Sequence, residues 1–390
     1  MSKRPLRIAI YSGEIPSTTF IERLIEGLAS ADNFIYLFGV RKKKTATQKN
    51  ILVVSYTHQR FVKLVHLLKY SVLLMLFKPR DKRKLDCILQ TRSKNNLYSK
   101  VKYYPVLWHR PDIFHIQWAK ALEDWMWVQE FGIKLVLSLR GAHINYSPIA
   151  NPDLAAMYQR YFPQVDGFHA VSQAMTNEAV SYGAASERIK VVYSGLGLEM
   201  IKNTKRTDGI IQILSVGRPH WIKGYHYALD AMSLLKSEGV AFEYHIIGGG
   251  DSEELLYQVG DLELEQEVTL LGALPFKEVQ KRVQMADVLL LSSVEEGIAN
   301  VVLEAMQLGT LVLSTECGGM REVITDGTNG FLVPIRNPRK IADALKDILE
   351  LSQMEKDVII ESAKNTISQR YSEAQMVAGM MGLYEEVFGS

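Results

Sequence analysis

The sequence predicts an α/β protein of two Rossmann-like, doubly wound domains. Short apolar runs alternate with amphipathic, helix-like segments in both halves of the chain, a pattern typical of a parallel sheet covered by helices. A polar stretch at 202–209 separates the halves and ends in the turn signal Asp208-Gly209. The 390 residues, 47% of them hydrophobic, suffice for two cores.

In the first half, the apolar runs expected to form strands lie at 6–11, 34–38, 51–54, 113–116, 134–139, 167–171 and 189–192. Helical patterns fill most of the gaps. Between 41 and 104 the pattern loosens and becomes basic. Lys63, His66 and Lys69 interrupt the apolar segment 61–77, so it predicts an amphipathic helix and not a membrane span.

The second half repeats the alternation. Its expected strands lie at 210–216, 242–247, 268–271, 288–291, 311–314 and 330–333. Its expected helices lie at 225–237, 252–259, 277–285, 300–308 and 320–325, with a helical tail from Pro338. Because the strands are parallel, ligands should bind at their carboxyl ends.

Charge is unevenly distributed, although the formal net charge is only +2. The segment 41–110 holds 18 of the 45 Lys and Arg residues but only two acids, Asp81 and Asp86. Cys87 and Cys317 are too few for a disulfide framework, which fits a reducing compartment.

Two glutamates follow the expected strand at 288–291. Glu296 lies in the loop, and Asn300 is expected to cap a helix that carries Glu304 one turn further on. Two carboxylates beside a helix start suit a ligand with both phosphates and hydroxyls, such as a nucleotide sugar. The alternative is a solvated loop pair and a surface glutamate. The backbone expected to bind the donor is that of Ile298, Ala299, Asn300 and Val301.

Two glycine-containing loops follow other strands of the second half. Gly217 allows a sharp turn, after which Arg218 and Lys223 could bind a diphosphate. The alternative is two surface cations. Gly248 and Gly249 permit close approach to a ribose or base, with a plain flexible turn as the alternative.

The first half offers three candidates at strand ends: Gly13, which could face a diphosphate, and Arg140 and His143, which could project into a cleft. The alternatives are a flexible turn, a surface cation and a hydrogen-bonded loop histidine. A structural role is favoured for His115 and Gln117. No HxxxH or CxxC spacing indicates a metal site, and Cys317 lacks an evident partner base.

The second half resembles family 4 of the glycosyltransferases, retaining enzymes with the GT-B fold of two Rossmann-like domains facing across a cleft. The resemblance spans about 210–334 and is specific as a set. Its motifs are Gly217-Arg218, Lys223-Gly224, Ile247-Gly248-Gly249-Gly250, Leu271-Gly272, Glu296 with Glu304-Ala305-Met306, Gly318-Gly319 with Glu322, and Asn329-Gly330. The first half matches more loosely, through Pro16-Ser17-Thr18-Thr19-Phe20, Pro111-Asp112-Ile113-Phe114-His115, Arg140-Gly141 and Val171-Ser172.

The resemblance implies a role for each matching residue. Arg218 and Lys223 would bind the donor diphosphate, Glu296 the sugar hydroxyls and Glu304 the ribose. Many members have a histidine at the position of Arg140. An arginine stands there in this chain, as it does in some polysaccharide-assembly members. The implied domains are 1–204, which holds the acceptor, 205–370, which holds the donor, and a helix at 371–390 that returns to the first domain.

The implied activity is transfer of a sugar from a nucleotide diphosphate sugar to a glycan or lipid-linked glycan in cell-surface polysaccharide assembly. No cofactor or metal is expected, because the two cations supply the charge. Two alternatives stay open: a GT-B enzyme that uses a soluble or phosphorylated sugar acceptor, and a non-catalytic binding or scaffold subunit.

The basic segment predicts where the protein works. Basic runs bracket the apolar segment 61–77, which suits peripheral binding to an anionic cytoplasmic leaflet. A solvated basic face over a core helix is the alternative. No nucleic-acid motif is present, so no nucleic-acid partner is expected. Lys3 and Arg4 lead directly into the first expected strand, without a signal peptide, which predicts a cytoplasmic location.

Overall fold

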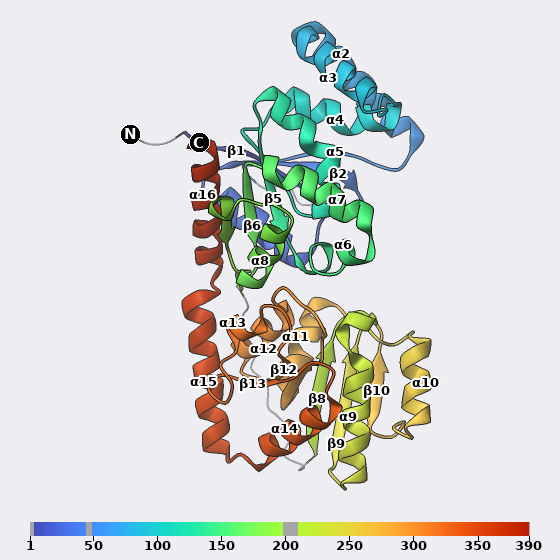
Figure 1. The fold of residues 1–390 in the computed structure, drawn as a ribbon, viewed down its shortest axis with the longest axis vertical. Coiled ribbons are helices and arrows are strands. Elements are labelled where there is room, and N and C mark those ends of the chain that lie inside the picture. The colour runs from blue at the N-terminus through green and yellow to red at the C-terminus, as the bar shows by residue number, and fades with distance from the viewer. Residues whose placement is uncertain (1–3, 44–48, 198–209, 390) are drawn as a thin grey trace. The chain divides into compact units, whose positions relative to one another are not determined.

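The computed structural model describes residues 4–43, 49–197 and 210–389 (Figure 1). These residues form two compact units. The N-terminal unit comprises the described residues up to 171, together with 175–195 and the segment from 373 onward. The C-terminal unit comprises 172–174 and the described residues from 196 to 372. The boundary expected at residues 204 and 205 lies outside the described residues.

The N-terminal unit contains a parallel sheet of seven strands in the order β3-β2-β1-β4-β5-β6-β7. The strands are β1 Arg7–Ile15, β2 Phe34–Arg41, β3 Ile51–Tyr56, β4 Ile113–Ile116, β5 Lys134–Leu139, β6 Gly167–Ala170 and β7 Ile189–Val191. The central strand β4 is buried throughout, as expected for a continuous apolar run between two helical layers. The strand order reverses between β1 and β4, so their carboxyl ends flank the position where such sheets bind ligands.

Gly13 lies inside β1 and not in a loop, which corrects the sequence expectation. The strand continues to Ile15 after a register shift between Ile10 and Gly13. Its neighbour in β2 is Gly39, where a Cβ would lie 2.7 Å from the carbonyl oxygen of Gly13. Close approach of two glycine backbones therefore extends the strand beyond the apolar run that marked it.

The helices of the N-terminal unit are α1 Thr19–Ser30, α2 Arg60–Phe77, α3 Pro79–Thr91, α4 Leu97–His109, α5 Leu122–Trp125, α6 Ser147–Ala150, α7 Pro152–Tyr161, α8 Gln173–Ser181 and α16 Glu373–Gly389. The helix expected at 61–77 is confirmed as α2. Helices α3 and α4 were not expected. Helix α3 is rich in charged residues and buries only Leu85 and Leu89, so it lacks a clear apolar pattern. Helices α2 and α3 pack with α4 at one end of the unit (Figure 1).

The last helix of the chain belongs to the N-terminal unit. In α16, Met380, Leu383, Tyr384 and Val387 are buried in the same cluster as apolar residues of α1 and β1. These side chains recur at helical spacing, so one face of α16 completes this core.

The C-terminal unit contains a second parallel sheet, of six strands, in the order β10-β9-β8-β11-β12-β13. The strands are β8 Ile211–Val216, β9 Phe242–Ile247, β10 Val268–Leu271, β11 Val288–Leu291, β12 Leu311–Thr315 and β13 Phe331–Val333. Its helices are α9 Tyr225–Ser237, α10 Glu253–Asp261, α11 Phe276–Met285, α12 Asn300–Leu308, α13 Met320–Val323, α14 Pro338–Glu350 and α15 Gln353–Arg370. The strand order reverses between β8 and β11, which places the loops after these strands side by side.

Asn300 does not cap α12, contrary to the sequence expectation. It is the first residue of the helix, and Ala299 occupies the cap position without a side-chain hydrogen bond. Gly309 ends the helix in the left-handed conformation, as its position predicted.

Candidate active site

Two loops meet at the carboxyl edge of the C-terminal sheet. The loop after β8 carries Lys223, and the loop after the neighbouring strand β11 begins with Ser292. The Ser292 hydroxyl donates to the carbonyl oxygen of Lys223 at 2.8 Å, and the Val294 amide donates to the carbonyl oxygen of Ile222 at 2.7 Å. These bonds fix the two loops against each other.

The close approach of these loops requires glycine at position 224. Gly224 has φ +61°, in the left-handed region, and a Cβ there would lie 2.2 Å from the carbonyl oxygen of Ser292. A larger residue would push the loops apart. The Lys223-Gly224 pair is therefore a local structural requirement for holding the lysine at this edge.

Lys223 and Glu296 form the centre of this edge. The Lys223 Nζ donates to Glu296 Oε1 at 2.6 Å, and the Ser293 hydroxyl donates to the same oxygen at 2.9 Å. Both ionised side chains are largely buried, with 23% and 17% of their surface exposed. Among the described residues, nothing donates to Glu296 Oε2. An ammonium has three donors, so the pair offers both N–H groups and a carboxylate oxygen to a ligand.

Arg218 lies exposed just beyond Gly217 at the end of β8. It forms no ion pair within the described part of the chain, so its planar fork of donors is available to an anion. Gly217 and Gly248 pack against each other, because a Cβ at Gly248 would lie 2.5 Å from the carbonyl oxygen of Gly217. Gly249 follows in the same loop after β9. Contact of these glycines with a ligand stays a prediction.

The start of α12 lies at the same edge of the sheet. Residues Ile298 and Ala299 precede the helix, and Val301 follows its first residue. The first amides of a helix lack intrahelical acceptors, so this segment retains the N–H groups expected to bind the donor. Glu304 lies one turn into the helix and is partly buried. The structure therefore gathers the predicted donor-site residues of the C-terminal unit at one sheet edge.

Cys317 is a poor candidate for a nucleophile. It is buried, and burial raises the pKa of its thiol to about 12. The thiolate is the reactive form, so this side chain is inert at neutral pH.

Arg140 and His143 lie at the carboxyl end of β5 in the N-terminal unit. The Arg140 guanidinium donates to Gln117 Oε1 at 3.0 Å and lies over the ring of Phe20, 4.7 Å from its centroid. Burial lowers the pKa of Arg140 to about 10, so it stays charged at neutral pH. The His143 ring lies 5.3 Å from that of Trp118. Burial, assisted by Lys120, lowers the pKa of His143 to about 4, which makes the neutral ring better suited to a hydroxyl than to a phosphate.

A continuous chain of hydrogen bonds runs beneath these side chains, and it gives His115 a structural environment. His169 Nε2 donates to the carbonyl oxygen of Val192 at 2.9 Å, so its Nδ1 accepts from the Ser138 hydroxyl. Ser138 in turn accepts from His115 Nε2 at 2.8 Å, and His115 Nδ1 accepts from the Tyr384 hydroxyl at 2.7 Å. Burial lowers the pKa of His115 well below its usual value and that of His169 to about 3. The chain ties α16 to the sheet through two neutral histidines.

A hollow of about 370 Å³ lies at the carboxyl ends of β1 and β2. It is lined by Ser12, Glu14, Pro16, Ser17, Thr18, Lys42, Lys43 and Trp118. Lys42 pairs with Glu14 at 2.6 Å, and the Trp118 indole donates to the carbonyl oxygen of Ser12 at 3.1 Å. Gly13 lies in the sequence between Ser12 and Glu14, two of the lining residues.

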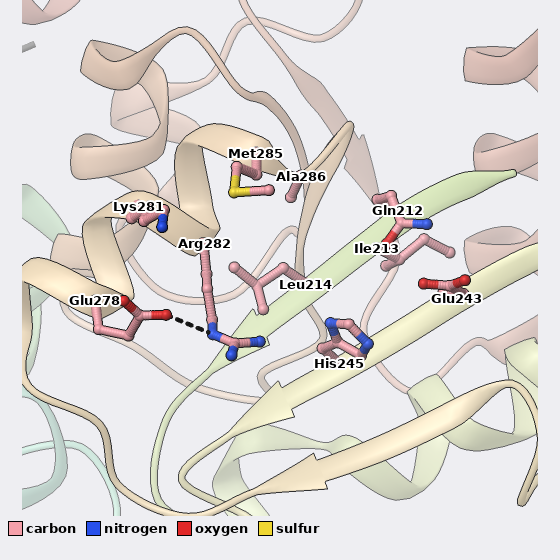
Figure 2. A pocket seen from close by; sticks show the side chains of 10 residues that line it. All are labelled: Gln212, Ile213, Leu214, Glu243, His245, Glu278, Lys281, Arg282, Met285 and Ala286. Carbon is pink, nitrogen blue, oxygen red and sulfur yellow. Dashed lines mark hydrogen bonds and ion pairs between the residues drawn. The ribbon is translucent and has the colours of Figure 1, made fainter. Parts of the chain in front are cut away.

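A separate pocket of about 290 Å³ lies on one face of the C-terminal sheet (Figure 2). Arg282 of α11 extends toward Leu214 and His245 and pairs with Glu278 at 3.2 Å (Figure 2). The pocket is lined by Gln212, Ile213, Leu214, Glu243, His245, Glu278, Lys281, Arg282, Met285 and Ala286. None of these was predicted as a site residue, and the pocket is distinct from the carboxyl edge.

Sequence reasoning missed three side chains that support the candidate residues: Ser293, Phe20 and Trp118. Ser293 could have been found, since it is the second residue of the loop that carries Glu296. Trp118 lies two residues after β4 and therefore belongs to the same sheet edge as the residues after β5. The position of Phe20 depends on how α1 packs, which the sequence does not show.

Two family models match consecutive parts of the chain. The model for glycosyltransferase family 4 matches residues 17–199, and the model for glycosyl transferases group 1 matches residues 199–366. The chain belongs to family 4 of the glycosyltransferases. The two sheets of this family 4 member have the parallel, doubly wound topology of the GT-B fold.

Curated relatives of this family 4 member include enzymes of bacterial polysaccharide synthesis. It is 35% identical to the amylovoran biosynthesis glycosyltransferase AmsK of Erwinia amylovora, over 52% of this chain and 51% of that protein. It is 30% identical to the putative colanic acid biosynthesis glycosyltransferase WcaL of Salmonella typhimurium, over 59% of each chain. The matches thus span between half and three fifths of these relatives' own length.

Solved structures support the fold. The crystal structure of HepE from Anabaena in complex with UDP and glucose matches with a TM-score of 0.71 over 97% of this chain and 99% of that one. The identity is 19%, so this likeness shows the GT-B architecture alone.

Proposed function

We propose that this chain is a retaining glycosyltransferase that moves a sugar from a nucleotide diphosphate sugar to a glycan or lipid-linked glycan acceptor. The observation that carries the proposal is the Lys223–Glu296 pair at the carboxyl edge of the C-terminal sheet, with the exposed Arg218 in the same loop as Lys223. The names of the polysaccharide-synthesis relatives support the acceptor class.

Each group has a role in this reaction. Arg218 and the free protons of Lys223 bind the donor diphosphate and stabilise its charge as it leaves, which is commonly the largest contribution to such catalysis. Glu296 Oε2 accepts hydroxyl protons of the donor sugar, and Glu304 accepts those of the ribose.

The bond changes balance without a protein nucleophile. The bond between the sugar's anomeric carbon and the β-phosphate oxygen breaks, and a bond from the acceptor oxygen forms on the same face of the sugar. The acceptor's proton passes to the departing phosphate. We propose that no metal takes part, since two cations already serve the diphosphate; within the described residues, no three His, Cys, Asp or Glu side chains cluster as metal ligands.

The test is release of nucleoside diphosphate when donor sugars are mixed with a membrane lipid extract as acceptor. Wild-type protein should release it, and Lys223→Ala should release it at least about 30-fold more slowly. Lys236→Ala is the matched control, because Lys236 also pairs with a glutamate of the same unit, Glu267, at 3.1 Å. Its activity should equal that of wild type. Equal rates in all three proteins would contradict the assignment of the site.

We further propose that the N-terminal unit binds the anionic cytoplasmic face of a membrane through α2. This helix exposes large apolar side chains to solvent, including Phe61 at 76%, Leu76 at 66% and Phe77 at 68%. Leu64, Val65, Leu68, Val72 and Met75 are exposed as well. In the part of the chain that is described, no helix has the length and hydropathy to cross a bilayer, so the proposed contact is peripheral.

Cations border this apolar surface. Arg80 and Arg83 of α3 are exposed, and neither forms an ion pair among the described residues. Lys82 is less available, because it pairs with Asp86 at 2.8 Å. Exposed apolar side chains beside free cations suit a surface of anionic lipid.

Co-sedimentation with phosphatidylglycerol vesicles at low and high salt tests the membrane proposal. Binding should decrease as salt rises, and Arg80→Glu with Arg83→Glu, or Leu76→Ser with Phe77→Ser, should weaken it at least tenfold. Ile149→Ser is the control, since Ile149 is 77% exposed on α6 of the same unit. Failure of wild-type protein to sediment at low salt would contradict membrane binding but not sugar transfer.

A further inference from the structure

Arg140 is a partly buried cation without a carboxylate, and its Nε is shielded from solvent. Its only hydrogen bond within the described residues goes to Gln117, and no described acid pairs with it. Buried cations are normally paired, because removing a charge from water costs several kcal/mol. Nearby His115 and His169 are neutral, and Phe20 presents only the face of its ring.

Gln117 adds a second, independent observation. Its side chain is fully buried, and its oxygen accepts from Arg140, but its amide nitrogen has no partner among the described residues. The Arg140 Nε is buried and unpartnered in the same way. Both nitrogens can only donate, so the contact between the two side chains leaves two unused donors beside a positive charge.

This arrangement serves a ligand better than it serves the fold. If Arg140 were structural, a carbonyl or carboxylate should complete its donors, as for most buried polar groups. What is missing is a set of acceptor oxygens carrying negative charge. The residues stand at the carboxyl ends of β4 and β5, the edge at which parallel sheets bind ligands.

We propose that Arg140 and Gln117 bind an anionic group, a carboxylate or a phosphate, carried by one of the sugar substrates. The proposal rests on the proposed function, because it assigns the substrate class of that reaction. It implies that the substrate is an acidic or phosphorylated sugar and that a neutral sugar of the same shape binds less well. Arginine suits this role because its fork matches both groups bidentately.

Saturation-transfer NMR titrations with glucuronate, glucose 6-phosphate and glucose test this proposal. The first two probes separate a carboxylate from a phosphate, and glucose is the neutral match. Wild-type protein should bind at least one anion about tenfold more tightly than glucose, as expected for one charge-assisted contact. Arg140→Met should abolish the preference, and Gln117→Met, which keeps the cation, should reduce it about threefold.

Arg160→Met is the matched control, because it removes a cation from α7 of the same unit and should leave the preference unchanged. Arg140→Met should also melt no lower than this control, since it removes a partly buried charge that no carboxylate compensates. No preference for either anion in wild type, or a preference that survives in both Arg140→Met and Gln117→Met, would overturn the proposal.

A separate titration with UDP, GDP and dTDP keeps the two proposals distinguishable. Arg140→Met should bind the nucleotides as wild type does, because the proposed function places the diphosphate at Arg218 and Lys223. If wild-type protein binds none of these nucleotides, the proposed function is contradicted. The sugar titrations would still decide whether Arg140 and Gln117 bind an anion.

Discussion

The carboxyl edge of the C-terminal sheet carries a cation that a carboxylate neutralises, whereas the carboxyl edge of the N-terminal sheet carries a partly buried cation without one. Lys223 pairs with Glu296, and Ser293 supports the pair. Arg140 has the neutral amide of Gln117 and the ring of Phe20. The two edges share a topology but differ in how their charge is compensated.

This difference determines which hydrogen-bond donors and acceptors each edge can offer to a ligand. The Lys223–Glu296 pair is stable without a ligand and offers both donors and an acceptor, which suits a group that carries phosphates and hydroxyls. The Arg140 edge offers only unused donors, which suits an anion. Variants at the Lys223–Glu296 edge and at the Arg140 edge should therefore differ in their effects on the stability of the protein and on ligand binding.

The largest effect is expected for Lys223→Ala, which removes a diphosphate contact and leaves Glu296 unpaired. We expect the transition state to lose about 2 to 4 kcal/mol of stabilisation, which lowers kcat/KM roughly 30- to 900-fold. The loss in kcat/KM for Arg218→Ala should lie in the lower half of this range, since removing Arg218 leaves no described residue without an ion-pair partner. Initial rates of nucleoside diphosphate release measure both, and unchanged kinetics would remove these residues from the site.

The two glutamates should separate sugar binding from nucleotide binding. Glu296→Ala should lower turnover more than affinity for the bare nucleoside diphosphate, because its partner is the sugar. Glu304→Ala should weaken the nucleotide itself about tenfold, the expected loss of one charge-assisted contact. Calorimetric titration with the nucleotide decides between them. A large loss for Glu296→Ala with none for Glu304→Ala would reverse the assignment.

The buried histidines of the N-terminal unit should make stability depend on pH. His169 has a folded pKa of about 3 against about 6.5 when unfolded, so the unfolded state binds more protons between these values. The free energy of unfolding should therefore decrease as pH falls below about 6.5, by up to about 1.4 kcal/mol per unit for each such histidine. Urea titrations from pH 7.5 to 5 measure this, and His169→Gln should give a shallower slope. An equal slope would contradict the neutral chain.

The smallest effect is expected for the cysteines. Cys317→Ala should change turnover less than about twofold, because burial keeps its thiol protonated. Thiol labelling of native protein should modify the exposed Cys87 and spare Cys317. Loss of activity on modification of Cys317 in the native state would indicate a role that its burial does not explain.

The sequence predicted both sheets because their strands are continuous apolar runs; β10 and β11, for example, lie where expected. It failed where tertiary contacts override local pattern. Helix α3 has only two buried residues, and β1 continues past its apolar run because Gly13 and Gly39 allow close approach.

The candidate site was predicted from the sheet topology, since loops that follow neighbouring parallel strands lie together at the carboxyl edge of the sheet. This prediction located Lys223 and Glu296 but not the ion pair between them, which depends on the turn at Gly224. Nor could it show that Arg140 lacks a counter-charge, because that depends on every side chain around it. The roles of these residues stay predictions until variants are measured.

The measurement that tests the central claim most directly is chemical unfolding of wild-type protein in the presence of a panel of nucleotide diphosphate sugars. At about 100 times its dissociation constant, the correct donor should raise the free energy of unfolding by about 2.7 kcal/mol. The matching nucleoside monophosphate, which lacks the phosphate that Arg218 and Lys223 would bind, should raise it much less. Stabilisation by no member of the panel, or equal stabilisation by the monophosphate, would contradict sugar transfer from a nucleotide diphosphate donor.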